Sequence, residues 1–267
     1  MSIARVRGIE LAYDVAGAGG VPIVLLHGFP FNRTLWREQV EAFDDRYQLI
    51  TPDLRGHGET TATHEPATME AMAEDVAALL DELGITGRVV LGGLSMGGYV
   101  ALAFCRLFPE RVAALVLADT RAQADTDEAR LTREETATRA LDEGMHTIAD
   151  SMLPKLLAPS THAERPEIVE RVREMILKTD PRGAAAALRG MAVRHDQTQF
   201  LREIDRPALV VVGSLDAITP PADSERMHRE IRGSRLAVIE GAGHVSNIER
   251  AAEFNRALEN FLRELDA

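Results

Sequence analysis

Short apolar runs alternate with amphipathic segments along most of the chain. A parallel sheet covered by helices produces this pattern, because each buried strand is followed by a helix that packs on the sheet. We therefore predict an α/β fold with a mostly parallel eight-stranded sheet and helices on both of its faces. The expected strands are Ile3–Gly8 and Glu10–Ala16, which form an antiparallel hairpin, and then Val21–Leu26, Tyr47–Pro52, Arg88–Leu91, Val112–Ala118, Ala208–Val212 and Arg235–Ile239.

Two helices are indicated by the spacing of their apolar residues. In Met69–Leu83 these residues recur at steps of three and four, so they form one stripe that can pack on a sheet, and Gly84 follows as a stop signal. The last helix is predicted at Ala251–Leu265. Its apolar side consists of Phe254, Leu258, Phe261 and Leu265.

The alternation stops between Asp125 and Gln199, where the sequence is charged, helical in character and punctuated by prolines. We predict about four short helices there. An insertion of this kind lies at the carboxyl ends of the strands, where open α/β sheets bind ligands. Residues 125–199 are therefore expected to form a helical cap, and residues 1–124 and 200–267 the α/β core domain. The alternative is a separate helical subdomain that does not touch the site.

A serine between glycines follows the strand predicted at Arg88–Leu91. The segment Gly92-Gly93-Leu94-Ser95-Met96-Gly97-Gly98 contains G-x-S-x-G, and a helix-prone stretch follows it. Strand, tight turn and helix are the context in which this motif presents a nucleophilic serine. So sharp a turn strains the serine backbone, and side chains at positions 93 and 97 would collide. We therefore predict that Ser95 is a nucleophile rather than a turn residue without chemistry.

Acyl transfer also needs two hydrogen-bond donors for the oxyanion of the tetrahedral intermediate. Met96, the residue after the nucleophile, is predicted to supply one through its backbone N–H. The second is expected from the loop His27-Gly28-Phe29-Pro30, which follows the third strand. Phe29 N–H is the candidate, and Gly28 allows the backbone to approach a ligand closely.

The acid and the histidine of a triad follow a serine of this type along the chain. Asp216 comes shortly after the strand Ala208–Val212, and His244 stands in a glycine-containing turn after Arg235–Ile239. His244 is predicted to take the proton of Ser95 and return it to the leaving group, while Asp216 holds the histidine tautomer.

Asp119 is a second candidate for the acid, because it also follows a strand and precedes His244. We favour Asp216, since the stretch around it matches the usual turn of the acid. Asp119 is then expected to pair with Arg121 at the base of the cap.

The remaining histidines lack a turn of this kind. His27 is expected to brace its loop by hydrogen bonding, and His57 is expected to be structural. Solvated or packed positions are predicted for His64, His146, His162, His195 and His228.

Composition excludes several classes of function. The formal net charge of −12 argues against a nucleic-acid partner, because phosphate binding needs a basic surface. No apolar run reaches the roughly 18 residues of a membrane span. The segment Met1–Arg7 lacks the apolar region of a signal peptide, and the single cysteine, Cys105, excludes an intrachain disulfide, so we expect a cytoplasmic protein. No spacing typical of metal ligands occurs, and no metal or other cofactor is expected.

Several stretches, in this order and spacing, resemble the α/β-hydrolase superfamily. They are residues 27–30, 52–58, 92–98, 213–220 and 241–244. Within the superfamily the chain resembles small bacterial carboxylesterases with a helical cap in Asp119-Thr120-Arg121-Ala122. It is also similar to 3-oxoadipate enol-lactonases in 244–249 and 175–181. Dehalogenases and epoxide hydrolases of this fold use an aspartate as nucleophile, so Ser95 argues against both.

These observations together predict a carboxylic ester hydrolase that acts on small esters of short to medium chain length through an acyl-enzyme. The expected substrate-binding residues are Phe29, Met152, Leu156 and Val245. A 3-oxoadipate enol-lactonase is the alternative with the same chemistry. It requires a cation near the acyl pocket, for which Arg121 and the cap arginines are candidates. A non-catalytic ligand-binding homologue is a remote alternative, because a complete triad serves no purpose in binding alone.

Overall fold

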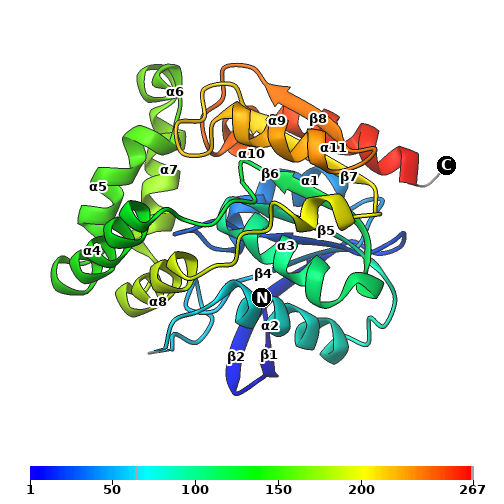
Figure 1. The fold of residues 1–267 in the computed structure, drawn as a ribbon, viewed down its shortest axis with the longest axis horizontal. Coiled ribbons are helices and arrows are strands. Elements are labelled where there is room, and N and C mark those ends of the chain that lie inside the picture. Colours follow the sequence, from blue (N-terminus) through cyan, green and yellow to red (C-terminus); the bar gives the residue numbers. More distant parts are fainter. Residues whose placement is uncertain (64, 266–267) are drawn as a thin grey trace.

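The computed structural model describes residues 1–63 and 65–265, in which eight strands form one sheet of order β1-β2-β4-β3-β5-β6-β7-β8 (Figure 1). β1 and β2 form an antiparallel hairpin, β2 pairs antiparallel with β4, and the other neighbours are parallel. The predicted fold class is therefore confirmed. The strands are β1 (Ser2–Val6), β2 (Ile9–Ala16), β3 (Ile23–Leu26), β4 (Leu49–Pro52), β5 (Val89–Leu94), β6 (Val112–Ala118), β7 (Ala208–Gly213) and β8 (Arg235–Ile239).

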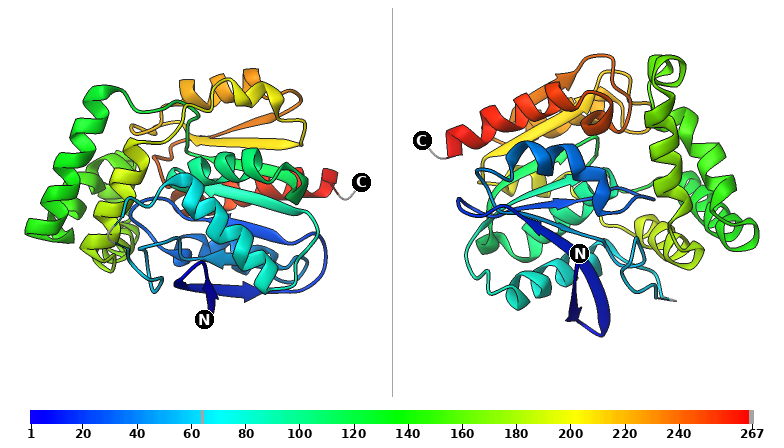
Figure 2. Two further views of the ribbon diagram at one scale, coloured as in Figure 1. Left: turned by 60° about the horizontal axis from the view of Figure 1, so that its bottom comes forward. Right: turned by 180° about the vertical axis from the view of Figure 1, so that it is seen from behind.

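Helices cover both faces of this sheet (Figure 2). α1 (Arg37–Phe43) and α11 (Ala251–Leu265) contact each other on one face, while α2 (Met69–Glu82) and α3 (Met96–Leu107) pack together on the other. The apolar stripes predicted for α2 and α11 are buried, except that their last residues, Leu83 and Leu265, are partly buried. The shorter helices of the core are α9 (Pro221–Glu230), α10 (Ser246–Glu249) and the 3₁₀ helices η1 (Arg33–Trp36), η2 (Pro109–Arg111) and η3 (Phe200–Glu203).

Between β6 and η3, a stretch that is described throughout, the chain forms five α-helices rather than about four short ones. The first of them is 17 residues long, and Thr126 begins it by accepting a hydrogen bond from the N–H of Ala129 at 3.2 Å. The five helices lie together on one side of the sheet (Figure 1). They are α4 (Asp127–Glu143), α5 (Met145–Leu156), α6 (Pro159–Glu164), α7 (Pro166–Leu177) and α8 (Pro181–Ala192).

β5 extends further than the sequence predicts, because it continues through two glycines to Leu94. Glycine disfavours a strand on propensity alone. Here Gly92 pairs with Leu25 of β3 and with Val116 of β6, and a Cβ at this position would overlap the Leu25 side chain. The backbone pairing with both neighbouring strands therefore outweighs the low strand propensity of glycine, and β5 continues to the carboxyl end of the sheet.

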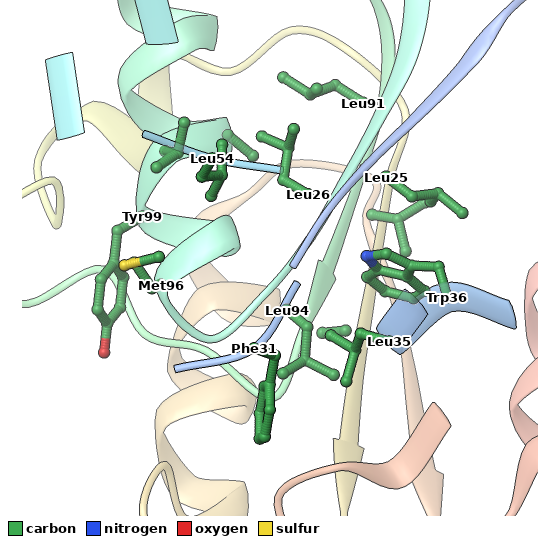
Figure 3. Packing of buried hydrophobic residues seen from close by; sticks show 14 of the residues in the cluster. Leu25, Leu26, Phe31, Leu35, Trp36, Leu54, Leu91, Leu94, Met96 and Tyr99 are labelled. Carbon is green, nitrogen blue, oxygen red and sulfur yellow. The ribbon is translucent and has the colours of Figure 1, made fainter. Parts of the chain in front are cut away.

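A dense apolar core supports the end of β5. Leu25, Leu26 and Leu91 come from the sheet, and Trp36 packs beside them from η1 (Figure 3). Trp36 also contacts Phe254 of α11, with 6.0 Å between the ring centroids. This packing fixes the ends of β3 and β5 relative to each other.

Two buried imidazoles join the loops that follow β3 and β4. His27 donates from Nδ1 to Gly28 O at 2.9 Å and accepts at Nε2 from the N–H of Leu54 at 2.9 Å, a pattern that requires the neutral ring. The ring of His57 lies 5.1 Å from that of His27 and 6.0 Å from that of Phe29. Burial lowers the pKa of His27 to about 4 and that of His57 to about 3.

These depressed pKa values predict that stability falls as the pH drops. A histidine with a lowered native pKa binds fewer protons in the folded state, so unfolding becomes easier as the pH drops below the unfolded value of 6.5. Between pH 6.5 and 5 the wild type should therefore lose about 2 kcal/mol more of its free energy of unfolding than His57→Leu does. Urea denaturation at both pH values measures this difference. The exposed His146 provides the control, since His146→Gln should keep the wild-type pH dependence. Equal slopes in wild type and His57→Leu would contradict the prediction.

Candidate active site

Ser95 occupies the turn between β5 and α3, at the carboxyl edge of the sheet. Its backbone lies in the left-handed half of conformational space, at φ 55° and ψ −115°, and the residue is only 8% exposed. A Cβ at Gly93 would overlap the carbonyl of Gly97, and a Cβ at Gly97 would overlap the carbonyl of Leu26. The two glycines are therefore required by the turn, which has the strained geometry expected for a nucleophile.

Hydrogen bonds from β6 and its loop hold this strained turn. Ser95 N–H donates to Ala118 O at 2.9 Å, and Thr120 Oγ1 donates to Ser95 O at 2.7 Å. Gly98, in the first turn of α3, packs so closely against Thr120 that a Cβ would overlap its side chain. These contacts together hold the backbone of Ser95 in its strained conformation, which would otherwise relax.

His244 and Asp216 form a buried pair. Nδ1 of His244 lies 2.8 Å from Oδ2 of Asp216, and both side chains are almost fully buried. Asp216 also accepts from Ile218 N–H at 2.8 Å, from Thr219 N–H at 2.9 Å and from Thr219 Oγ1 at 2.6 Å. Burial opposes ionisation, but the histidine and these donors hold the pKa of Asp216 below its usual value. The carboxylate is therefore ionised and orients the imidazole.

Asp119 has a different set of partners. Its Oδ1 accepts from Gly213 N–H at 2.8 Å and its Oδ2 from Ser246 Oγ at 2.5 Å. Burial and the negative charge of Asp216 raise its pKa well above the usual value. In the described residues Asp119 makes no hydrogen bond to His244, so the geometry favours Asp216 as the partner of the imidazole.

The expected pairing of Asp119 with Arg121 is wrong. Arg121 turns away from it, donates to Ile218 O and lies 3.6 Å from Asp223. The carboxyl group of Asp119 accepts hydrogen bonds from neutral donors instead. These donors offset only part of the free-energy cost of burying a carboxylate.

The structure brings Ser95 to the same edge as the His244 pair, but over the residues described no hydrogen bond joins Ser95 Oγ to the imidazole. The turn of Ser95 and the loop of His244 are connected through the end of β6. Ala118 accepts from Ser95, and the next residue, Asp119, accepts from Ser246, two positions after the histidine. Long or missing catalytic hydrogen bonds are common in enzymes without substrate.

The two backbone amides that the sequence predicts as oxyanion donors, those of Met96 and Phe29, lie in segments next to Ser95. Met96 N–H belongs to the first turn of α3 and has no acceptor within the helix. Phe29 N–H lies in the loop after β3, next to Gly28, whose Cβ position is 3.1 Å from Ser95 Cβ. Neither amide donates to a protein acceptor in the described part of the chain.

Glu249 links the His244 loop to the helical insertion by hydrogen bonds, a role that was not predicted from the sequence. Its buried carboxylate accepts from Gly243 N–H at 2.7 Å, from Ala158 N–H at 2.8 Å and from Thr161 Oγ1 at 2.6 Å. The N–H of His244 itself donates to Leu156 O, at the end of α5, at 2.9 Å. The backbone around the histidine is therefore set by the insertion as much as by the core.

Of the predicted substrate-binding residues, Phe29 and Met152 line a cavity of about 530 Å³ that is bounded by α4, α5 and the core. Ile218, two residues after Asp216, lines it as well. Leu156 and Val245 are fully buried, and neither is among the described residues that line this cavity.

The other predicted histidines lie away from this site. His162 contacts Leu153 O at 3.0 Å, His228 contacts Ser234 Oγ at 2.9 Å, and His146 and His195 are exposed. His64 lies outside the described residues. Across residues 1–63 and 65–265, no cluster of three or more His, Cys, Asp or Glu side chains is arranged to hold a metal ion. No helix in these ranges has the length and apolar character needed to cross a membrane.

Comparison with known proteins identifies the family. A family model described as the alpha/beta hydrolase fold matches residues 21–251. 3-Oxoadipate enol-lactonase 2 of Acinetobacter baylyi is 30% identical over 96% of this chain and 94% of its own length.

Solved structures agree with this match. A malate-bound thermophilic esterase from Thermogutta terrifontis is 47% identical, with a TM-score of 0.95 over 97% of this chain and 95% of that one. The enol-lactonase from Burkholderia xenovorans LB400 is 31% identical, with a TM-score of 0.91 over 98% of this chain and 100% of that one. With the family model covering most of its length, the chain belongs to the α/β-hydrolase fold family.

Proposed function

We propose that this protein is a carboxylic ester hydrolase in which Ser95, His244 and Asp216 act as a catalytic triad. The observation that carries the proposal is the buried His244–Asp216 pair at the sheet edge where the strained turn presents Ser95. Esterases and lactonases among the relatives support hydrolysis of a small ester or lactone.

The chemistry follows from the proton positions. His244 Nε2 takes the proton of Ser95 Oγ as the oxygen attacks the carbonyl carbon, and Asp216 stabilises the imidazolium. The oxyanion is bound by the N–H groups of Met96 and Phe29. His244 then protonates the leaving alcohol, and a water molecule activated by the same imidazole releases the acid from Ser95.

We also propose that residues 125–199 act as a cap over this site, with residues 1–124 and 200–267 as the core domain. The hydrogen bonds from Ala158 and Thr161 to Glu249 support this role, as does the cavity between the insertion and Phe29. A cap of this kind shapes the space available to the substrate, whereas the triad sets the reaction.

Opening of an enol-lactone is the second candidate, since it uses the same steps with a cyclic substrate. It is favoured by the similarity to two enol-lactonases over nearly the whole chain. Rates on 3-oxoadipate enol-lactone and on p-nitrophenyl butyrate decide between them, and a lactone rate no better than the ester rate counts against a lactonase.

Replacement of the nucleophile tests the mechanism. Ser95→Ala should lower kcat on p-nitrophenyl acetate and butyrate by at least about 10⁴-fold, because no other group can form the acyl-enzyme. It should also abolish labelling by a fluorophosphonate probe. Ser160→Ala, in α6, is the control and should retain both. Wild-type turnover in Ser95→Ala would end the proposal, and a wild type that resists the probe would point to a binding protein.

The two buried aspartates predict unequal losses. Asp216→Asn should lower kcat about 10³- to 10⁴-fold, because the amide cannot stabilise the imidazolium and favours the wrong tautomer. Asp119→Asn should cost no more than about tenfold in kcat, since the raised pKa of Asp119 indicates that a neutral side chain suits its site. Steady-state kinetics with thermal unfolding of both variants measures the contrast. The reverse order would assign the acid to Asp119.

A further inference from the structure

The cavity beside Phe29 has features that the chemistry of Ser95 does not explain. At about 530 Å³ it has the size of a small-molecule site. Its larger apolar lining residues are Phe29, Met152, Leu188 and Ile218, and most of its other lining residues belong to α4 and α5.

The walls carry more positive than negative charge. Arg133, Arg139 and Lys155 line the cavity together with one carboxylate, Glu128. Arg133 is neutralised by its ion pair with Asp125. Arg139 and Lys155 are exposed and form no ion pair with any described residue. Glu128 precedes Arg139 by almost the length of α4, roughly 16 Å along the helix axis.

This local charge is opposite in sign to that of the whole molecule. With a formal net charge of −12, the average surface repels anions. Unpaired cations around one cavity therefore create a local potential that attracts an anionic group. The cavity borders the candidate site through Phe29 and through Ile218, two residues after Asp216, while Ser95 and His244 are not among the described residues that line it.

Lys155 is the cation tied most directly to the reactive centre. The carbonyl of the next residue, Leu156, accepts a hydrogen bond from the backbone N–H of His244 at 2.9 Å. Met152, one helical turn earlier, lines the same cavity. Ile218, which also lines the cavity, donates its N–H to Asp216. Lys155 thus extends from the helix end that contacts the imidazole loop.

We propose that Lys155 binds a carboxylate carried by the substrate, and that it makes the site selective for esters or lactones of dicarboxylic acids. The inference rests on the proposed hydrolase function and names the substrate class of the same site. The ammonium group provides three donors on a flexible four-carbon stem, so it can meet carboxylates at more than one distance from the scissile bond.

Two esters that differ only in charge test this role. Monomethyl adipate carries one carboxylate at neutral pH, and dimethyl adipate carries none, so the ratio of their kcat/KM values measures selectivity for the anion. Initial rates of acid release are followed by pH-stat titration for wild type, Lys155→Met, Lys155→Arg and Lys155→Glu. Lys178→Met is the matched control, because Lys178 is an exposed lysine of the same insertion that does not line the cavity in the described structure.

The ratio should fall about tenfold in Lys155→Met, fall further in Lys155→Glu, and be largely restored in Lys155→Arg. Lys178→Met should keep the wild-type ratio. Salt should lower the ratio of the wild type, because the attraction is partly screened. If Lys155→Met keeps the wild-type ratio of the two kcat/KM values, the inference is overturned. This holds also when the rates on both esters fall by the same factor. Hydrolysis of the neutral ester with no dependence on Lys155 leaves the proposed function standing. A wild type that cleaves p-nitrophenyl butyrate but not monomethyl adipate overturns the inference alone, whereas one that cleaves none of these esters and resists the fluorophosphonate probe overturns both.

Discussion

The candidate site depends on one buried carboxyl group, that of Asp119. β5 and β8 lie three positions apart in the sheet, so the turn of Ser95 and the loop of His244 do not meet through strand pairing. Asp119 closes this gap from the end of β6. Its preceding carbonyl accepts from Ser95, and its carboxyl group accepts from Gly213 at the end of β7 and from Ser246 in the histidine loop. The side chain of Asp119 thereby fixes two segments, and the backbone carbonyl beside it holds the third.

This arrangement has an energetic cost that the fold has to offset. Asp119 adopts a positive φ of 44°, and Ser95 does so at 55°, so two strained residues are adjacent in space. Burial and the nearby charge of Asp216 also oppose ionisation of Asp119, as its raised pKa shows. The packed ends of β3 and β5, with Trp36 and Leu25 beneath them, hold the strain (Figure 3). Strain of this kind is tolerated where the surroundings leave no relaxed alternative, and here it places a serine and a histidine loop at one edge.

Local chemistry accounts for what could be predicted from the sequence. The α/β sheet follows from hydrophobic periodicity, and the positions of Ser95, Asp216 and His244 follow from glycine-containing turns at strand ends. The steric need for Gly93 is local, because a Cβ there would overlap Gly97, whereas Gly97 is required by the distant carbonyl of Leu26. The role of Glu249 was missed because its partners, Ala158 and Thr161, are about 90 residues away in the chain.

The partners of long side chains could not be predicted for the same reason. Arg121 follows Asp119 closely in the sequence, yet it pairs with Asp223 across the sheet edge. The contact between Thr219 and Asp216 is an intermediate case. An aspartate often accepts hydrogen bonds from the residues two or three positions after it, so this contact has a local signal in the sequence. The sequence therefore predicts the contacts of a residue when its partners are close in the chain. It does not predict them when folding brings the partners together from distant segments.

The links between the insertion and the histidine loop constrain how specificity can change. Leu156 accepts from the backbone of His244, and Glu249 joins Gly243 to Ala158 and Thr161. The end of α5 therefore forms a wall of the cavity and also positions the His244 loop. A backbone shift in α5 that enlarges the cavity would move the imidazole as well, whereas a change in a side chain that only projects into the cavity leaves these hydrogen bonds intact. Side chains that line the cavity, such as those at positions 152 and 155, can thus vary without disturbing the His244–Asp216 pair. The bond from α5 to His244 uses the backbone carbonyl of Leu156, and Asp216 is held by Ile218 and Thr219.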